Sequence, residues 1–150
     1  MTKRATEESI GSMAMRNRIL LFDTSIFVDQ LRTDRHRERI ASVSGRIRHS
    51  SVVLAELLRG AKKRPDRDFV EALSKRPLLL TPSEKNWLES GHLLSRMSVE
   101  HGFLPGKLRD LHFDVLIALT ASTHGATVIT SNRPDFELIQ RHKRFALEIW

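Results

Sequence analysis

The sequence of 150 residues contains no cysteine and no tyrosine. Without cysteine the chain has no disulfide bond, no thiolate zinc site and no cysteine nucleophile, and this composition suits a reducing compartment such as the cytoplasm. Aromatic residues make up only 6% of the chain, so few side chains are available to stack on nucleic-acid bases. These absences direct the search for function to the acidic and basic side chains.

Long hydrophobic runs are also missing. The first apolar run, Ile19–Phe22, has four residues and ends at Asp23. A signal peptide needs an apolar stretch of about 7–15 residues and a transmembrane helix needs about 20. We therefore expect a cytoplasmic protein with no membrane span. The charged, Ser/Thr-rich residues 1–15 are expected to form a flexible tail, followed by a single domain at residues 16–150.

Charge is abundant and unevenly distributed. The chain holds 25 basic and 18 acidic residues, a net charge of +7, and residues 1–75 hold 16 of the basic and 10 of the acidic groups. Basic side chains cluster at residues 32–48 and 59–67. Such clusters attract a polyanion, but they are also consistent with a solvated helix face or a contact surface for an acidic partner segment. The candidate phosphate contacts are Arg59, Lys62 and Lys63.

Short apolar runs alternate with segments of helical pattern. We predict strands at residues 19–22, 49–53, 78–80, 126–130 and 145–149. We predict helices at residues 25–31, 35–44, 54–61, 68–74, 83–101, 113–124 and 134–140, with a loop at 102–106. Wholly apolar runs such as Ile19–Phe22 are typical of strands buried on both faces. The alternation predicts an α/β fold with a parallel sheet covered by helices on both faces.

Four carboxylates lie beside apolar segments. Asp23 and Asp135 each follow a predicted strand, at the edge of an open α/β sheet where ligands bind. Glu56 and Asp114 lie beside apolar faces near the start of their predicted helices. Burying an unpaired carboxylate costs several kcal/mol, so some interaction must offset the charge of these residues.

Each acid could also have a purely local role, as a helix cap or as half of an exposed pair. The caps would be Asp23, Asp114 and Asp135 with Asn132, and the exposed pair would be Glu56 with Arg59. If the four acids instead converge, their mutual repulsion raises their pKa values unless a cation intervenes. Oxygen-only ligands favour Mg²⁺ or Mn²⁺ over zinc, and such an ion can activate water and stabilise charge on a phosphate. This interpretation indicates phosphodiester hydrolysis.

Four motifs occur in a fixed order within residues 18–140. They are Asp23-Thr24-Ser25, Val53-Leu54-Ala55-Glu56-Leu57, Asp114-Val115-Leu116-Ile117-Ala118, and residues 125–132 followed by Asp135-Phe136. In this order and at this spacing they resemble PIN-domain nucleases, and more narrowly VapC toxins of type II toxin–antitoxin pairs. The resemblance implies a Rossmann-like PIN fold at residues 16–150 and a metal-dependent endoribonuclease. It further implies an RNA substrate, a homodimer, and a cognate antitoxin whose peptide reaches the active-site groove.

The resemblance also assigns roles to residues. The catalytic acids would be Asp23, Glu56, Asp114 and Asp135, of which Asp23, Asp114 and Asp135 would bind Mg²⁺ or Mn²⁺. The supporting polar residues would be Thr24, Ser25, Thr130 and Asn132, with Ser25 standing where many members of the family carry asparagine. Asp110, one helical turn before Asp114, is the alternative or supplementary third acid.

Other interpretations remain open. A PIN-like module could bind RNA or a partner without cleaving, a solitary nuclease could process RNA without an antitoxin, and a structural protein could use these acids only as helix caps. The seven histidines form no pair at i, i+4 on a predicted helix, so we expect most of them on the surface rather than at a metal.

Overall fold

The fold is built on a sheet of four parallel strands. The computed structural model describes residues 2–76 and 79–150. In the described residues the strands are β1 (Ile19–Phe22), β2 (Arg46–Arg48), β3 (Ala126–Thr130) and β4 (Ala146–Ile149), in the order β2-β1-β3-β4. Leu21 of β1 lies opposite Arg48 of β2 and Val128 of β3, and all pairings are parallel. The predicted parallel α/β sheet is confirmed.

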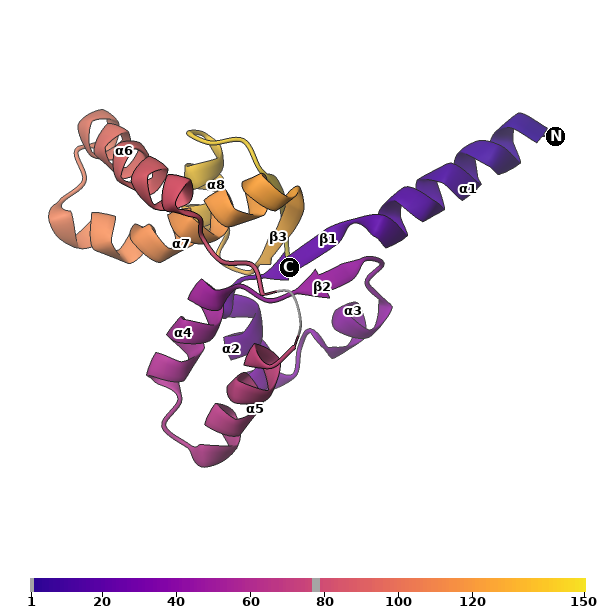
Figure 1. Cartoon of the computed structure of the whole chain (residues 1–150), viewed down its shortest axis with the longest axis horizontal. Helices are drawn as coiled ribbons and strands as arrows, with labels where there is room; N and C mark the ends of the chain where they lie inside the picture. The colour runs from indigo at the N-terminus through magenta and orange to yellow at the C-terminus, as the bar shows by residue number, and fades with distance from the viewer. Residues whose placement is uncertain (1, 77–78) are drawn as a thin grey trace.

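Helices connect the strands and cover the sheet. An N-terminal helix, α1 (Thr2–Asn17), precedes β1. Between β1 and β2 lie α2 (Thr24–Thr33) and α3 (Arg37–Ser42). Between β2 and β3 lie α4 (Ser51–Gly60), α5 (Arg64–Ser74), α6 (Glu84–His101) and α7 (Pro105–His124), and α8 (Arg133–Gln140) precedes β4. Figure 1 shows α6, α7 and α8 grouped together and α2, α4 and α5 forming a second group.

Two apolar clusters form on opposite sides of the sheet, because successive side chains of a strand point to opposite faces. Leu21 and Val128 join a large cluster with residues of α4 to α8, including the fully buried Leu116. Leu20 and Ile129 join a smaller cluster with residues of α2 and α3. Burial on both faces explains why β1 and β3 carry apolar side chains on both faces of the sheet.

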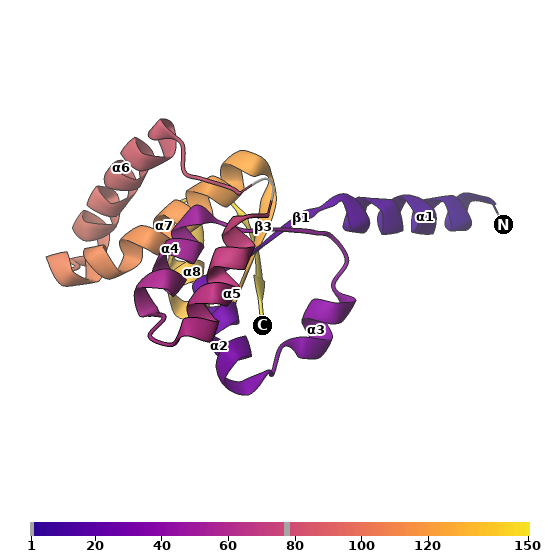
Figure 2. The ribbon, with the colours of Figure 1, turned by 60° about the horizontal axis from the view of Figure 1, so that its bottom comes forward.

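Residues 2–17 form α1, which extends away from the rest of the chain in both views (Figures 1 and 2). Its side chains from residue 6 onward are exposed, including Ile10, Met13 and Met15. That residues 1–15 are a flexible tail, and that a single domain begins at residue 16, stays a prediction. Nowhere in residues 2–76 and 79–150 is a helix both long and apolar enough to cross a membrane.

The second strand differs from its prediction. Residues 49–53 were expected to be a strand, but β2 is Arg46–Arg48 and α4 begins at Ser51. The reason is a helix cap: the Ser50 hydroxyl accepts hydrogen bonds from the backbone nitrogens of Val52 (3.2 Å) and Val53 (3.4 Å). Of the predicted strand at 78–80, residue 78 lies outside the described residues, and Leu80 forms only an isolated bridge with Ser50.

The helix that carries Asp114 begins earlier than predicted. We expected a loop through residue 106 and a helix from 113, whereas α7 begins at Pro105. Proline is favourable in the first turn of a helix, where its missing N–H has no intrahelical partner. The earlier start places Lys107 and Asp110 on the same helix as Asp114. For α6, by contrast, the predicted start is confirmed, since Ser83 and Asn86 form a capping box.

Candidate active site

Asp23 lies at the carboxyl end of β1 and is almost fully buried, with 3% of its surface exposed. It is the N-cap of α2, because its Oδ2 accepts a hydrogen bond from the backbone nitrogen of Ser25 (3.3 Å). The same oxygen accepts from Ser25 Oγ (2.7 Å) and Thr130 Oγ1 (2.8 Å). Asp23 therefore caps a helix. It is also a buried carboxylate held by the hydroxyl groups of Ser25 on α2 and Thr130 at the end of β3.

A hydroxyl network fixes the Asp23 carboxylate. Thr130 ends β3, the parallel neighbour of β1, so the carboxyl ends of the two strands meet here. Ser25 Oγ accepts from the backbone nitrogen of Ser131 (3.0 Å), and Thr130 Oγ1 accepts from that of Asn132 (2.9 Å). Burial raises the pKa of Asp23, and the hydrogen bonds from Ser25 and Thr130 only partly offset this rise.

Glu56 lies on α4 and is linked to the same sheet edge. Its Oε1 accepts a hydrogen bond from Thr24 Oγ1 at 3.0 Å, and Thr24 directly follows Asp23. Burial, followed by the negative charge of Asp23, raises the pKa of Glu56, against the lowering effects of Thr24 and Arg59. Arg59 lowers the pKa of Glu56 through its positive charge. The Arg59 guanidinium lies 5.5 Å from the ring centre of Phe113.

Asp114 lies in the middle of α7, so the prediction that it caps a helix is wrong. Burial raises its pKa to about 8, and the charges of Asp23, Glu56 and Asp135, in that order, contribute to the rise. The charges of three acids that are far apart in the sequence thus act on Asp114. That the four acids form one metal site stays a prediction.

Asp135, in the first turn of α8, is held by two nitrogen donors. Lys107 Nζ lies 3.0 Å from its Oδ1, and Asn132 Nδ2 donates to its Oδ2 at 3.2 Å. The predicted interaction between Asp135 and Asn132 is thus present. Lys107 was missed, because the sequence placed it at the edge of a loop. Its charge lowers the pKa of Asp114 and partly offsets the repulsion.

A family model for the PIN domain matches residues 20–141 of the sequence. The chain belongs to the PIN-domain family. A comparison with curated proteins gives no match.

Solved structures agree with this assignment. A chain of VapBC2 from Rickettsia felis, solved bound to a promoter DNA fragment, is 27% identical with a TM-score of 0.64, over 88% of this chain and 98% of that one. Chains of VapBC from Salmonella typhimurium and VapBC-1 from Haemophilus influenzae are each 24% identical with a TM-score of 0.65. They cover 89% and 88% of this chain respectively and 98% of their own, and show the shared fold. The resemblance found in the sequence is thereby confirmed.

Asp110 does not take part in the acid cluster of this PIN domain. It is exposed on α7, whereas the charges that shift the pKa of Asp114 come from Asp23, Glu56, Asp135 and Lys107. Of the two candidate third acids, the geometry favours Asp114.

The donor set of the PIN domain fits a hard divalent cation. The converging groups are carboxylates, and hydroxyl and amide groups support them. Mg²⁺ and Mn²⁺ prefer oxygen ligands of this kind. Besides burial, the negative charges of Asp23, Glu56 and Asp135 raise the pKa of Asp114, and Lys107 offsets them only in part. A divalent ion would remove this cost.

A groove with charges of both signs lies beside Glu56. Thr24 and Glu56 line a cavity of about 440 Å³ between α2, α4 and α5, together with Arg32, Lys63 and Asp66. The neighbouring Arg59 and Lys62 are exposed, as Lys63 is. One cationic member of each basic cluster in the sequence thus reaches the groove next to the carboxylates.

Proposed function

We propose that the protein is a Mg²⁺- or Mn²⁺-dependent endoribonuclease and the toxin of a toxin–antitoxin pair. The observation that carries this proposal is the Asp114 carboxyl group, whose pKa is raised to about 8 by burial and by three other acids. A protein gains nothing in stability from such repulsion. A bound divalent cation would offset this repulsion and allow Asp114 to ionise.

Asp23, Asp114 and Asp135 would hold the ion, with Glu56 beside them. When bound, the ion supplies a Lewis acid that activates water and stabilises charge on the scissile phosphate. Ser25 and Thr130 orient Asp23 through their bonds to Oδ2. Thr24 orients Glu56, which lies where it could accept a proton from water.

Lys107 and Asn132 keep Asp135 in place. Because the Lys107 ammonium is a mobile donor on a flexible stem, it can compensate the acids before the ion binds and turn to a phosphate oxygen afterwards.

RNA is the substrate that the charge distribution favours. Arg59, Lys62 and Lys63 follow Glu56 in the chain, and Lys63 shares its cavity. Basic side chains of this kind bind a phosphate backbone independently of base sequence, with an affinity that falls as salt rises. We therefore expect substrate affinity to depend on ionic strength and on these side chains.

The cleavage assay compares wild-type protein with three variants, using structured RNA with Mg²⁺ and with EDTA. Asp23→Asn and Asp114→Asn each remove one ligand charge, so we expect each to lower the cleavage rate at least about 100-fold. Asp110→Asn is the matched control, because it removes an exposed acid one turn away on the same helix. Cleavage in EDTA, or equal activity in all three variants, would contradict the proposal. RNA binding without cleavage would instead support a non-catalytic module.

The toxin assignment rests on the solved relatives, which are VapBC complexes. We expect a small neighbouring gene to encode an antitoxin, and we expect the toxin to form a homodimer. Co-expression of the two genes should restore growth that the toxin alone arrests. Growth arrest that the neighbour does not relieve, or no arrest at all, would favour a solitary RNA-processing nuclease.

A further inference from the structure

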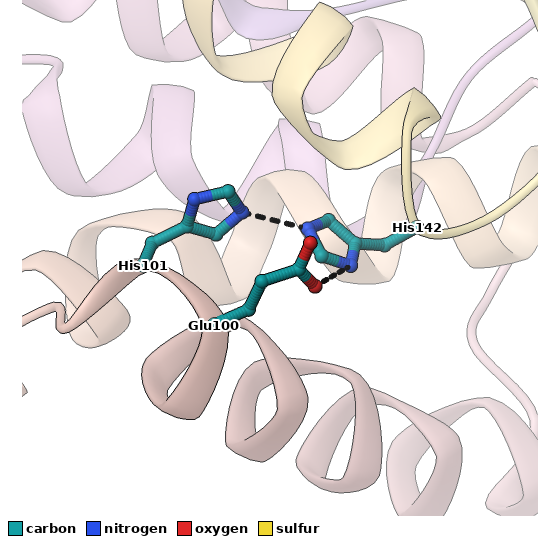
Figure 3. A group of neighbouring side chains, drawn as sticks. All are labelled: Glu100, His101 and His142. Atoms are coloured by element: carbon teal, nitrogen blue, oxygen red, sulfur yellow. Dashed lines mark hydrogen bonds and ion pairs between the residues drawn. The ribbon is translucent and has the colours of Figure 1, made fainter.

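A second group of possible metal ligands lies away from the acid cluster. Glu100 and His101 end α6, and His142 lies in the turn between α8 and β4. Nε2 of His101 is 2.9 Å from Nε2 of His142, and Oε2 of Glu100 is 3.6 Å from Nδ1 of His142. Figure 3 shows the three side chains turned toward one another, although 41 residues separate the two histidines.

Local contacts hold both imidazoles in place. The ring of His101 stacks on Phe103, with 5.1 Å between ring centres and 22° between planes. Gly102 makes this stacking possible, because its left-handed backbone (φ 66°) turns the chain back at the end of α6. The backbone nitrogen of His142 donates to Ile139 at 2.9 Å, and only 9% of its side chain is exposed. The two rings are therefore positioned before any ligand arrives.

The close approach of the two Nε2 atoms constrains where the two imidazole rings carry their protons. With both rings neutral, one Nε2 must donate a proton and the other must accept it. If the donor ring moves its proton to Nδ1, both Nε2 lone pairs face the same point. A zinc ion with bonds of about 2.0–2.1 Å in tetrahedral geometry separates two nitrogen ligands by about 3.3 Å. The rings would need to open by only about 0.4 Å.

Glu100 completes the set. One ligand atom from each of the three residues lies within 4.8 Å of the others. Two imidazoles and one carboxylate suit zinc better than Mg²⁺, because imidazole is the softer ligand. The adjacent Lys143 is engaged with Glu89 at 2.6 Å, which reduces its repulsion of a cation.

We propose that His101, His142 and Glu100 bind Zn²⁺, with water as the fourth ligand. This site joins the end of α6 to the turn before β4. It differs in ligand chemistry from the carboxylate cluster and does not depend on the nuclease proposal. Its role is to stabilise the packing of the C-terminal turn against the α6–α7 pair.

The test uses untagged, chelator-treated full-length protein titrated with Zn²⁺ by calorimetry, and with Co²⁺ by its visible absorption. His101→Ala is the main variant, because His101 is exposed at the end of α6 and its side chain is not part of the buried core. We expect one high-affinity site in the wild type and a Zn²⁺ affinity at least about tenfold weaker in His101→Ala and His142→Ala. His92→Ala, an exposed histidine on the same helix, is the matched control and should bind as wild type does.

Two more variants distinguish this site from zinc binding at the acid cluster and from an imidazole pair that binds no metal. Asp114→Asn should keep the Zn²⁺ site, whereas loss of binding in that variant would place the ion at the acid cluster and overturn the proposal. Glu100→Gln should weaken Zn²⁺ binding and change the Co²⁺ spectrum. No Zn²⁺ binding by the wild type would show a hydrogen-bonded imidazole pair only and would overturn the proposal. Equal affinity of wild type and His101→Ala, or no effect of Glu100→Gln, would also overturn it.

Discussion

Replacing Asp114 by asparagine should stabilise the metal-free protein at alkaline pH. In the folded chain the pKa of Asp114 is raised to about 8 from its ordinary value of 3.8. Below pH 4 the carboxyl group is protonated in both the folded and the unfolded state, so it costs nothing. As the pH rises toward 8 the unfolded state ionises first, and the free energy of unfolding falls.

The size of the effect follows from the shift. One pKa unit corresponds to about 1.36 kcal/mol, so a shift of this size has an upper limit of roughly 6 kcal/mol. Asp114 is only partly buried, and solvent that reaches it screens part of the repulsion. We therefore expect Asp114→Asn to unfold with a free energy about 1–3 kcal/mol higher than wild type at pH 8, and about equal at pH 4.

The assay is urea unfolding in EDTA at pH 4 and pH 8, followed by circular dichroism. Asp110→Asn is the control, because its exposed carboxylate should leave the pH dependence unchanged. Added Mg²⁺ should stabilise the wild type and have a smaller effect on Asp114→Asn. A variant that is less stable than wild type at pH 8, or that keeps the full pH dependence, would refute the convergence of charge at Asp114.

Three further predictions concern neighbours of the site and the fold. Thr130→Val removes a hydrogen bond to Asp23, so we expect a stability loss of about 1 kcal/mol and roughly tenfold weaker Mg²⁺ binding by calorimetry; unchanged binding would contradict the orienting role. Lys107→Met removes a compensating cation, so Mg²⁺ at pH 8 should raise the melting temperature of this variant more than that of the wild type. A smaller rise than in the wild type would count against this role of Lys107. Gly45→Ala should cost about 1–3 kcal/mol, because φ is 144° and a Cβ would lie 2.9 Å from the Arg18 carbonyl oxygen. Gly60→Ala, with nothing within 4 Å of its Cβ, is the matched control, and equal stability of the two variants would contradict this reasoning.

Most of the architecture could be predicted because local signals agreed with the final packing. The buried strand β1 is apolar throughout and β3 mostly so, and Ser83 with Asn86 marks the start of α6. The strand predicted at residues 49–53 was wrong, since Val52 and Val53 fit a buried strand as well as the first turn of a buried helix. The Ser50 cap decides between them.

The acids and the polar residues that support them could be predicted from the sequence, but Lys107 could not. Asp23 and Asp135 follow strands, which places them at one edge of the sheet. Lys107 was missed because its role depends on α7 beginning at Pro105 and on a contact with a residue 28 positions away. The pairing of His101 with His142 was missed for the same reason. The two histidines are 41 residues apart in the chain, and only the fold brings them together.

The most direct test is the position of a divalent ion. Crystals soaked in Mn²⁺ and measured at the manganese absorption edge would locate it by anomalous scattering. We predict a peak within coordination distance of the carboxylates of Asp23, Asp114 and Asp135, and no peak there in Asp114→Asn. A wild-type crystal with no manganese at these carboxylates, at a concentration that supports RNA cleavage, would contradict the account.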